Sequence, residues 1–161
     1  MSRKFAKIRS NLWKSEKMRN LSPNGKLLAM YLLTSPAYSM IGIYEQSKVV
    51  AQKHTGLSVG DFDAALAELQ AIDFVRFDEE TEVVWVVDMA LTQIADGGLS
   101  EQQRKGVINE LTRLKTECQF PFVDEFINYY REKYPFLPSD SHELDWDQIP
   151  YGGGIETRDK R

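Results

Sequence analysis

The spacing of apolar and polar positions in the central part of the chain predicts two helices followed by a β-hairpin. The first helix covers residues 45–55 and ends at Gly56, because glycine readily takes the left-handed conformation that closes a helix. Strands over 74–78 and 83–87 form the hairpin, and a short β-like run over 41–44 precedes the helices.

The second helix of this pair has a clear start and one apolar face. Ser58 is the predicted N-cap, and we expect Asp61 to bond back to the Ser58 backbone, as in a capping box. Apolar side chains then fall at i, i+3, i+4 and i+7, on one side of the helix: Phe62, Ala65, Leu66 and Leu69. Two helices joined by a short glycine-containing turn and followed by a hairpin form the outline of a winged helix-turn-helix.

The N-terminal segment mixes basic and apolar side chains. Residues 3–9 alternate loosely, which predicts an edge strand with one cationic face; the alternative is a solvated arm. Residues 11–20 form a short helix or an irregular turn, in which we expect Leu12, Trp13 and Met18 to hold the segment on the core.

A longer helix follows this segment. Ser22 is its predicted N-cap and Pro23 its first residue, and the helix runs to about Thr34. One stripe of this helix is expected to face the core: Leu27, Leu28, Tyr31 and Leu32.

Two more helices are predicted after the hairpin. Ser100 caps one that runs to about residue 115, and Pro121 starts the other. Phe122, Phe126 and Tyr130 form an aromatic stripe on the last helix. Such a stripe either packs in the core, as helical spacing favours, or stacks on bases of a single-stranded nucleic acid.

Length and composition limit the class of protein. A chain of 161 residues that is 42% hydrophobic buries one ordinary core. Its longest apolar run, 27–33, is far shorter than the roughly 20 residues of a membrane-spanning helix, and its N-terminus lacks the apolar core of a signal peptide. The single cysteine, Cys118, excludes an internal disulfide, so we expect a cytoplasmic protein.

Charge is strongly polarised along the chain. Residues 1–26 carry eight basic side chains and one acid, a net charge of +7. Residues 27–99 carry three basic and eleven acidic side chains, a net charge of −8. The protein therefore presents two electrostatically different surfaces to its partners.

Several segments together resemble a known family. They are the helix over 21–36, the run over 41–44 with its helix pair and hairpin, the stretch 122–135, and the glycine-rich stretch 149–161. They are similar to the N-terminal domain of phage and prophage replication-initiation proteins, the replisome organisers related to the bacterial primosome component DnaD. The resemblance implies an α+β, mainly α, winged helix-turn-helix with a C-terminal helical extension.

The resemblance also implies a function and a domain organisation. Such proteins bind origin DNA and recruit a helicase loader or helicase in the bacterial host cytoplasm, without chemistry of their own. We expect a winged-helix domain over 1–95, a helical extension over 96–137, and a flexible linker or tail over 138–161, which precedes a second domain in the family.

The predicted DNA contacts come from the basic segment. The outward side of the second helix, the recognition helix in this reading, has no Arg or Lys, and the hairpin turn is acidic. Phosphate contacts are therefore expected from Arg3, Lys4, Lys7, Arg9, Lys14, Lys17 and Arg19, helped by Lys48 and Lys53. Seven contacts to duplex DNA, which we expect rather than single strands, give a log–log salt slope of about −6.

The acidic surface has two readings. Asp63, Ala67 and Gln70 on the recognition helix, with Glu79 and Glu80 on the hairpin, either bind a protein partner or only keep the domain soluble. Head-to-tail contact with the basic segment of another copy would give a homo-oligomer. Two other functions remain open: an adaptor that docks a helicase loader without touching DNA, and a winged-helix transcriptional regulator.

Residues for catalysis or metal binding are sparse. His54, His142 and Cys118 have no paired spacing, so no metal site is predicted. The sequence has no phosphate-binding glycine loop of the Walker type, which leaves an ATPase function without support. We therefore expect a non-catalytic protein without a cofactor.

Overall fold

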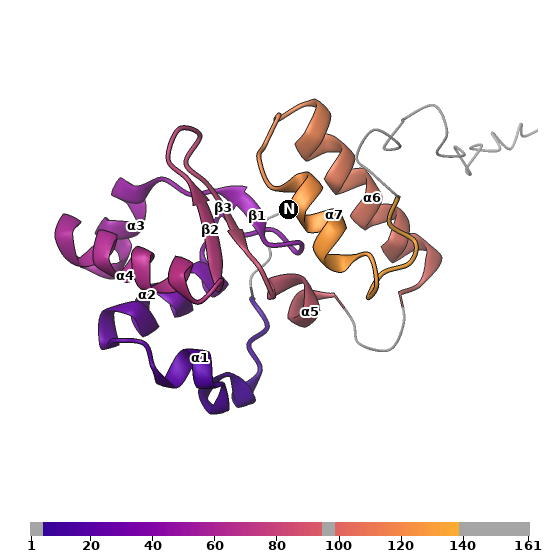
Figure 1. The fold of residues 1–161 in the computed structure, drawn as a ribbon. Helices are drawn as coiled ribbons and strands as arrows, with labels where there is room; N and C mark the ends of the chain where they lie inside the picture. The colour runs from indigo at the N-terminus through magenta and orange to yellow at the C-terminus, as the bar shows by residue number, and fades with distance from the viewer. Residues whose placement is uncertain (1–4, 95–98, 139–161) are drawn as a thin grey trace, which may run out of the picture.

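The computed structural model describes residues 5–94 and 99–138, which form an α+β, mainly helical fold (Figure 1). A small antiparallel sheet lies between two groups of helices, α2–α4 on one side and α6–α7 on the other (Figure 1). The elements in chain order are the 3-10 helix η1 (Ser10–Lys14), α1 (Glu16–Arg19), α2 (Pro23–Thr34), β1 (Ile43–Glu45), α3 (Lys48–Thr55), α4 (Val59–Ala71), β2 (Val75–Asp78), β3 (Val83–Val86), α5 (Met89–Gln93), α6 (Glu101–Thr116) and α7 (Val123–Tyr130).

The central strand of the sheet, β3, is buried on both faces. The strand order is β1-β3-β2, with Trp85 opposite Ile43 on one side and Arg76 on the other. Side chains alternate along a strand, so Val84 and Val86 pack toward the core of α2 and α4, whereas Trp85 packs toward α6 and α7. Strand β3 therefore contributes side chains to two apolar cores, one on each face of the sheet.

The core on the α2 and α4 side confirms the predicted face of α4. Phe62, Ala65, Leu66 and Leu69 are all buried, and they pack with Leu28, Leu32 and Met18. The predicted stripe of α2 is wrong in one place: Leu27 is 43% exposed, and Ala29 and Leu33 are buried instead. The buried stripe of α2 is therefore rotated toward Ala29 and Leu33.

The core on the other side contains the predicted aromatic stripe. Phe126 and Tyr130 are fully buried, and the Phe126 ring lies 6.1 Å from that of Trp85. The Tyr130 hydroxyl donates to the backbone carbonyl of Val87. The predicted start at Pro121 is wrong: α7 begins at Val123, and Phe122 precedes it in the left-handed conformation, partly buried against the same core. The aromatic rings are thus part of the core, and α6 and α7 share that core with the sheet. The predicted boundary at residue 95 and the tail beyond 138 lie outside the described residues.

The predicted edge strand near the N-terminus is wrong for the part that the structure describes. Residues 5–9 lack regular secondary structure. The buried Gln93 side chain takes the place of a neighbouring strand: its Oε1 accepts from the backbone N–H of Lys7, and its Nε2 donates to the Lys7 carbonyl. These bonds also exclude a wholly solvated arm over 5–9. Arg3 and Lys4 lie outside the described residues.

Two predicted helix starts need correction. The helix that ends at Gly56 begins at Lys48 rather than at Glu45, because Glu45 pairs with Val83 in the sheet. Ser58 caps α4 by accepting from the Asp61 N–H at 3.1 Å, but no return bond from Asp61 is present. An aspartate is one methylene shorter than the Glu or Gln that completes a capping box, and α6 does form the complete box, with Ser100 and Gln103.

Candidate nucleic-acid interface

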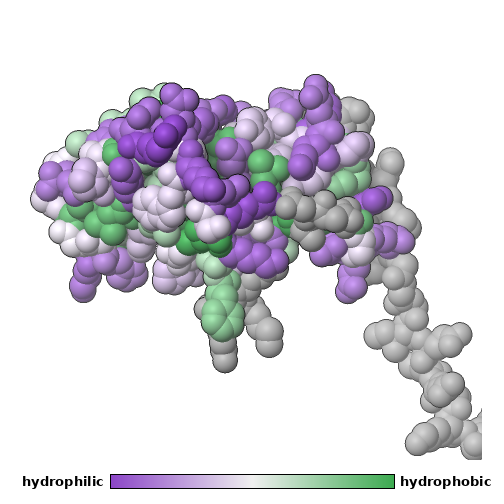
Figure 2. Space-filling model, turned by 90° about the horizontal axis from the view of Figure 1, so that it is seen from below, coloured by the Kyte–Doolittle hydropathy of each residue, from purple (hydrophilic) through white to green (hydrophobic). Residues whose placement is uncertain are grey.

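A basic surface is built by the segment that contains η1 and α1. Met18 is fully buried and Leu12 partly buried, and these two side chains attach the short helices to the core. The predicted DNA-binding residues of this segment that lie within the described residues are exposed: Lys7, Arg9, Lys14, Lys17 and Arg19. Figure 2 shows the molecule from the side on which α1 lies in Figure 1, and hydrophilic side chains cover much of this face.

The basic side chains differ in how they are held. The Arg9 guanidinium donates to the Leu91 carbonyl at 3.1 Å, which fixes the chain against α5. In contrast, the side chains of Lys14, Lys17 and Arg19 form no ion pair with any described carboxylate. The acid nearest to them in sequence is Glu16. Their charge is therefore available to an anionic partner.

A hollow of about 140 Å³ lies where this segment meets the hairpin. Lys7 and Lys17 line it from the N-terminal segment, and Phe74, Val86 and Asp88 line it from the base of the hairpin. The hairpin turn lies at the other end of β2 and β3, away from α1 (Figure 1). The basic surface and the acidic turn are consequently at opposite ends of the hairpin.

The acidic surface consists of the outward side of α4 and the hairpin turn. Asp63, Ala67 and Gln70 are exposed on α4, as predicted, and Glu79 and Glu80 are exposed at the turn. Helix α4 contains no Lys or Arg. A helix of this charge would be repelled by the phosphates that border a DNA groove, and α4 has no Lys or Arg to contact phosphates or guanine.

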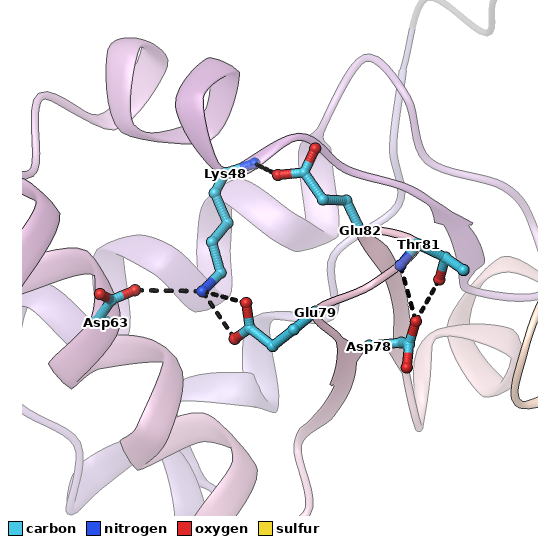
Figure 3. Close-up of polar contacts among 6 residues, drawn as sticks. All are labelled: Lys48, Asp63, Asp78, Glu79, Thr81 and Glu82. Atoms are coloured by element: carbon cyan, nitrogen blue, oxygen red, sulfur yellow. Dashed lines mark hydrogen bonds and ion pairs between the residues drawn. The ribbon is translucent and has the colours of Figure 1, made fainter.

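Lys48 joins the elements of the acidic surface (Figure 3). Its ammonium nitrogen lies 2.7 Å from a Glu79 carboxylate oxygen and 3.4 Å from Asp63 Oδ1. Partial burial by itself lowers the pKa of Lys48, but the hydrogen bonds and charges of Glu79 and Asp63 outweigh it, so the pKa lies above its ordinary value. Lys48 is therefore engaged with two carboxylates, whereas Lys53, also predicted to contact DNA, is exposed on α3.

The hairpin turn is ordered by its own side chains (Figure 3). The Asp78 carboxylate accepts from the Thr81 hydroxyl at 2.6 Å and from the Thr81 N–H at 2.9 Å, and these bonds hold the pKa of Asp78 below its ordinary value. Glu82 turns back and accepts from the Lys48 N–H at the start of α3. Asp78 thus stays negatively charged at neutral pH. The Glu82 carboxylate of the hairpin caps the N-terminus of α3.

Two exposed aromatic rings lie in the basic segment, and sequence reasoning did not assign them to the site. Trp13 is 52% exposed and Phe5 is 83% exposed. The expectation that Trp13 holds the segment on the core is wrong, because η1 turns its neighbour Leu12 inward and Trp13 outward. The signal in the sequence is the interleaving of these rings with Lys and Arg.

Other kinds of site find little support in the part of the chain that the structure describes. Residues 5–94 and 99–138 contain no group of three His, Cys, Asp or Glu side chains able to hold a metal ion. None of the helices there is long and apolar enough to cross a membrane. No family model, no curated protein and no solved structure matches this chain.

Proposed function

We propose that the chain is a non-catalytic DNA-binding and partner-recruiting module of a phage-type replication-initiation protein, built on a winged helix-turn-helix and acting in the cytoplasm of a bacterial host. The order helix, strand, two helices and hairpin supports this fold, as does the strand order β1-β3-β2. The family resemblance of the sequence supports the role in replication.

The observation that carries the DNA-binding proposal is the basic surface of η1 and α1. Lys14, Lys17 and Arg19 project from two short anchored helices and have no carboxylate partner in the described part of the chain. Lysine and arginine side chains in such positions bind phosphates and release counterions from the nucleic acid. The backbone beneath them is fixed, so their charges are held together and do not scatter along a free arm.

In this proposal, DNA binds at the end of the hairpin that is away from the turn. The acidic side of α4 and the turn then remain open for a protein partner, which we propose to be a helicase loader or a helicase. Lys48 supports this division, because it is engaged with Glu79 and Asp63 on the acidic surface.

Fluorescence anisotropy with a labelled duplex across a salt series tests the proposal. Five phosphate contacts from Lys7, Arg9, Lys14, Lys17 and Arg19 predict a log–log slope of about −4 to −5. A slope near zero, or an absence of binding at low salt, would contradict the proposal. Circular dichroism of the same sample confirms that the protein is folded.

The acidic surface also supports a second candidate function, an adaptor that binds only proteins. Asp63, Glu79 and Glu80 gather on one surface with the small side chain of Ala67, a combination that suits a basic protein partner better than DNA. One such partner is the basic segment of a second copy. Sedimentation at low and high salt tests this form: self-association that disappears at high salt supports it, and a monomer at both contradicts it.

A further inference from the structure

The basic surface carries an exposed indole. Trp13 is 52% exposed, and its ring contacts no other aromatic ring in the described part of the chain. Tyr129 is comparably exposed, but its hydroxyl donates to Asp88 and its ring packs on Trp85. Among the described residues Trp13 has no comparable partner, although large aromatic rings normally contribute to a core or an interface.

The position of Trp13 is set by the fold. The turn of η1 is closed by bonds from the Leu12 N–H to the Arg9 carbonyl and from the Ser15 N–H to the Leu12 carbonyl. Leu12 packs on the core, so its neighbours Trp13 and Lys14 are held outward. The indole is thus presented by an anchored element and does not lie on a free terminus.

Basic residues lie close to Trp13 in the sequence. Lys14 follows it directly, and Lys17 and Arg19 lie on the next helix, α1. Phe5, which is 83% exposed, supplies a second ring in the same basic segment. Cations that follow a phosphate backbone, combined with aromatic faces on which bases stack, are the combination that binds single-stranded nucleic acids.

We propose that the basic surface binds single-stranded nucleic acid, with Trp13 stacking on an unpaired base while Lys14, Lys17 and Arg19 contact the phosphates. This inference rests on the proposed function and names the strand form that the surface prefers. In a duplex the faces of the bases are covered by their neighbours, so Trp13 adds affinity only for single strands. The preference differs from the duplex DNA expected from the sequence.

The test compares Trp13→Leu with Trp13→Phe, using oligo(dT), oligo(rU) and a duplex of equal length as probes. Leucine keeps an apolar side chain without an aromatic face, whereas phenylalanine keeps the face. We expect Trp13→Leu to weaken oligo(dT) binding by about tenfold and duplex binding by less than about twofold, while Trp13→Phe retains most of the affinity. Oligo(dT) should also quench tryptophan emission in the wild type more than in Trp13→Phe. Comparison of the affinities for oligo(dT) and oligo(rU) shows whether the surface prefers DNA or RNA.

The outcomes separate this inference from the proposed function. Equal losses for oligo(dT) and duplex in Trp13→Leu, or no loss for either, overturn the stacking role and leave DNA binding by the cations intact. If no probe binds the wild type at low salt, both proposals fail. Phe5→Leu is a second variant, chosen because the Phe5 ring is 83% exposed. A selective loss of oligo(dT) affinity in Phe5→Leu supports the inference even if Trp13→Leu is poorly folded.

Discussion

The backbone N–H of Lys48 donates a 2.9 Å hydrogen bond to the carboxylate of Glu82, so the hairpin supplies the N-terminal cap of α3. Ser47, which precedes the helix, forms no side-chain cap. The same lysine reaches Glu79 with its ammonium group. One residue of α3 is therefore held twice by the hairpin, and this fixes the acidic turn against the helix pair.

Loss of this cap should destabilise the fold. Glu82→Ala is expected to lower the free energy of unfolding by about 1 kcal/mol, the usual cost of removing a helix N-cap. Urea unfolding followed by circular dichroism measures the change. Glu80→Ala is the matched control, because Glu80 is exposed on the same turn and has no side-chain partner in the described residues; an equal loss in both variants would contradict the capping role.

A second carboxylate predicts a pH dependence of stability. Glu68 of α4 accepts from the Ser22 hydroxyl at 2.6 Å and from the Ser22 N–H at 2.9 Å, and these bonds hold its pKa below the ordinary value of 4.5. Because the folded state favours the ionised form, the stabilisation is present above pH 4.5 and is lost as the pH falls through the folded-state pKa.

Comparison with Glu68→Gln isolates this effect from other acids. At pH 7 we expect the variant to be less stable by about 1 kcal/mol, at the low end for bonds to a charged group because Glu68 is only partly buried. The difference should shrink as the pH falls below 4.5. Unfolding curves at pH 7 and pH 3 that give the same difference would show that ionisation of Glu68 does not contribute.

Gly42 is required by the close approach of β3. Its φ is +84°, and a Cβ there would lie 2.6 Å from the Val86 carbonyl oxygen. Gly42→Ala should therefore cost about 2–3 kcal/mol, from backbone strain and a disturbed bond between the Val86 N–H and the Gly42 carbonyl. Gly106→Ala in α6 meets no atom within 4 Å and should stabilise by about 0.5–1 kcal/mol. Thermal unfolding of both variants checks the contrast.

The aromatic stripe of α7 should affect stability and leave nucleic-acid binding unchanged. Tyr130→Phe leaves the buried Val87 carbonyl without its donor, with an expected cost of about 1–2 kcal/mol. Tyr129→Phe, at an exposed hydroxyl, should cost much less. Binding to oligo(dT), measured where Tyr130→Phe is fully folded, should equal that of the wild type; a selective loss would place α7 in the interface.

Local patterns predicted local structure well. The apolar spacing from Phe62 to Leu69 and the cap at Ser58 depend only on residues within two turns, and both predictions are confirmed. The partners of Lys48 and Lys7 were not predictable in this way, because Glu79 lies 31 residues from Lys48, and Gln93 lies 86 residues from Lys7. These pairs exist only after the hairpin and α5 have packed.

The exposure of Trp13 shows a different limit. Whether a single tryptophan next to Leu12 points inward depends on the turn of η1, and a 3-10 turn rotates side chains differently from an α-helix. Burial preference alone assigned both side chains to the core. The basic residues around Trp13 were evident in the sequence, but the exposure of the ring required the fold.

The central claim is that nucleic acid binds the surface of η1 and α1, away from α4 and the hairpin turn. The most direct measurement compares two variants in the same anisotropy assay, with duplex and oligo(dT) at low salt: Lys14, Lys17 and Arg19 changed to Ala, and Lys48 and Lys53 changed to Ala. We predict that the first variant loses about tenfold or more in affinity for both probes, while the second stays within about twofold of the wild type. Strong loss in the second variant with little change in the first would place the nucleic acid on the helix pair and contradict the account.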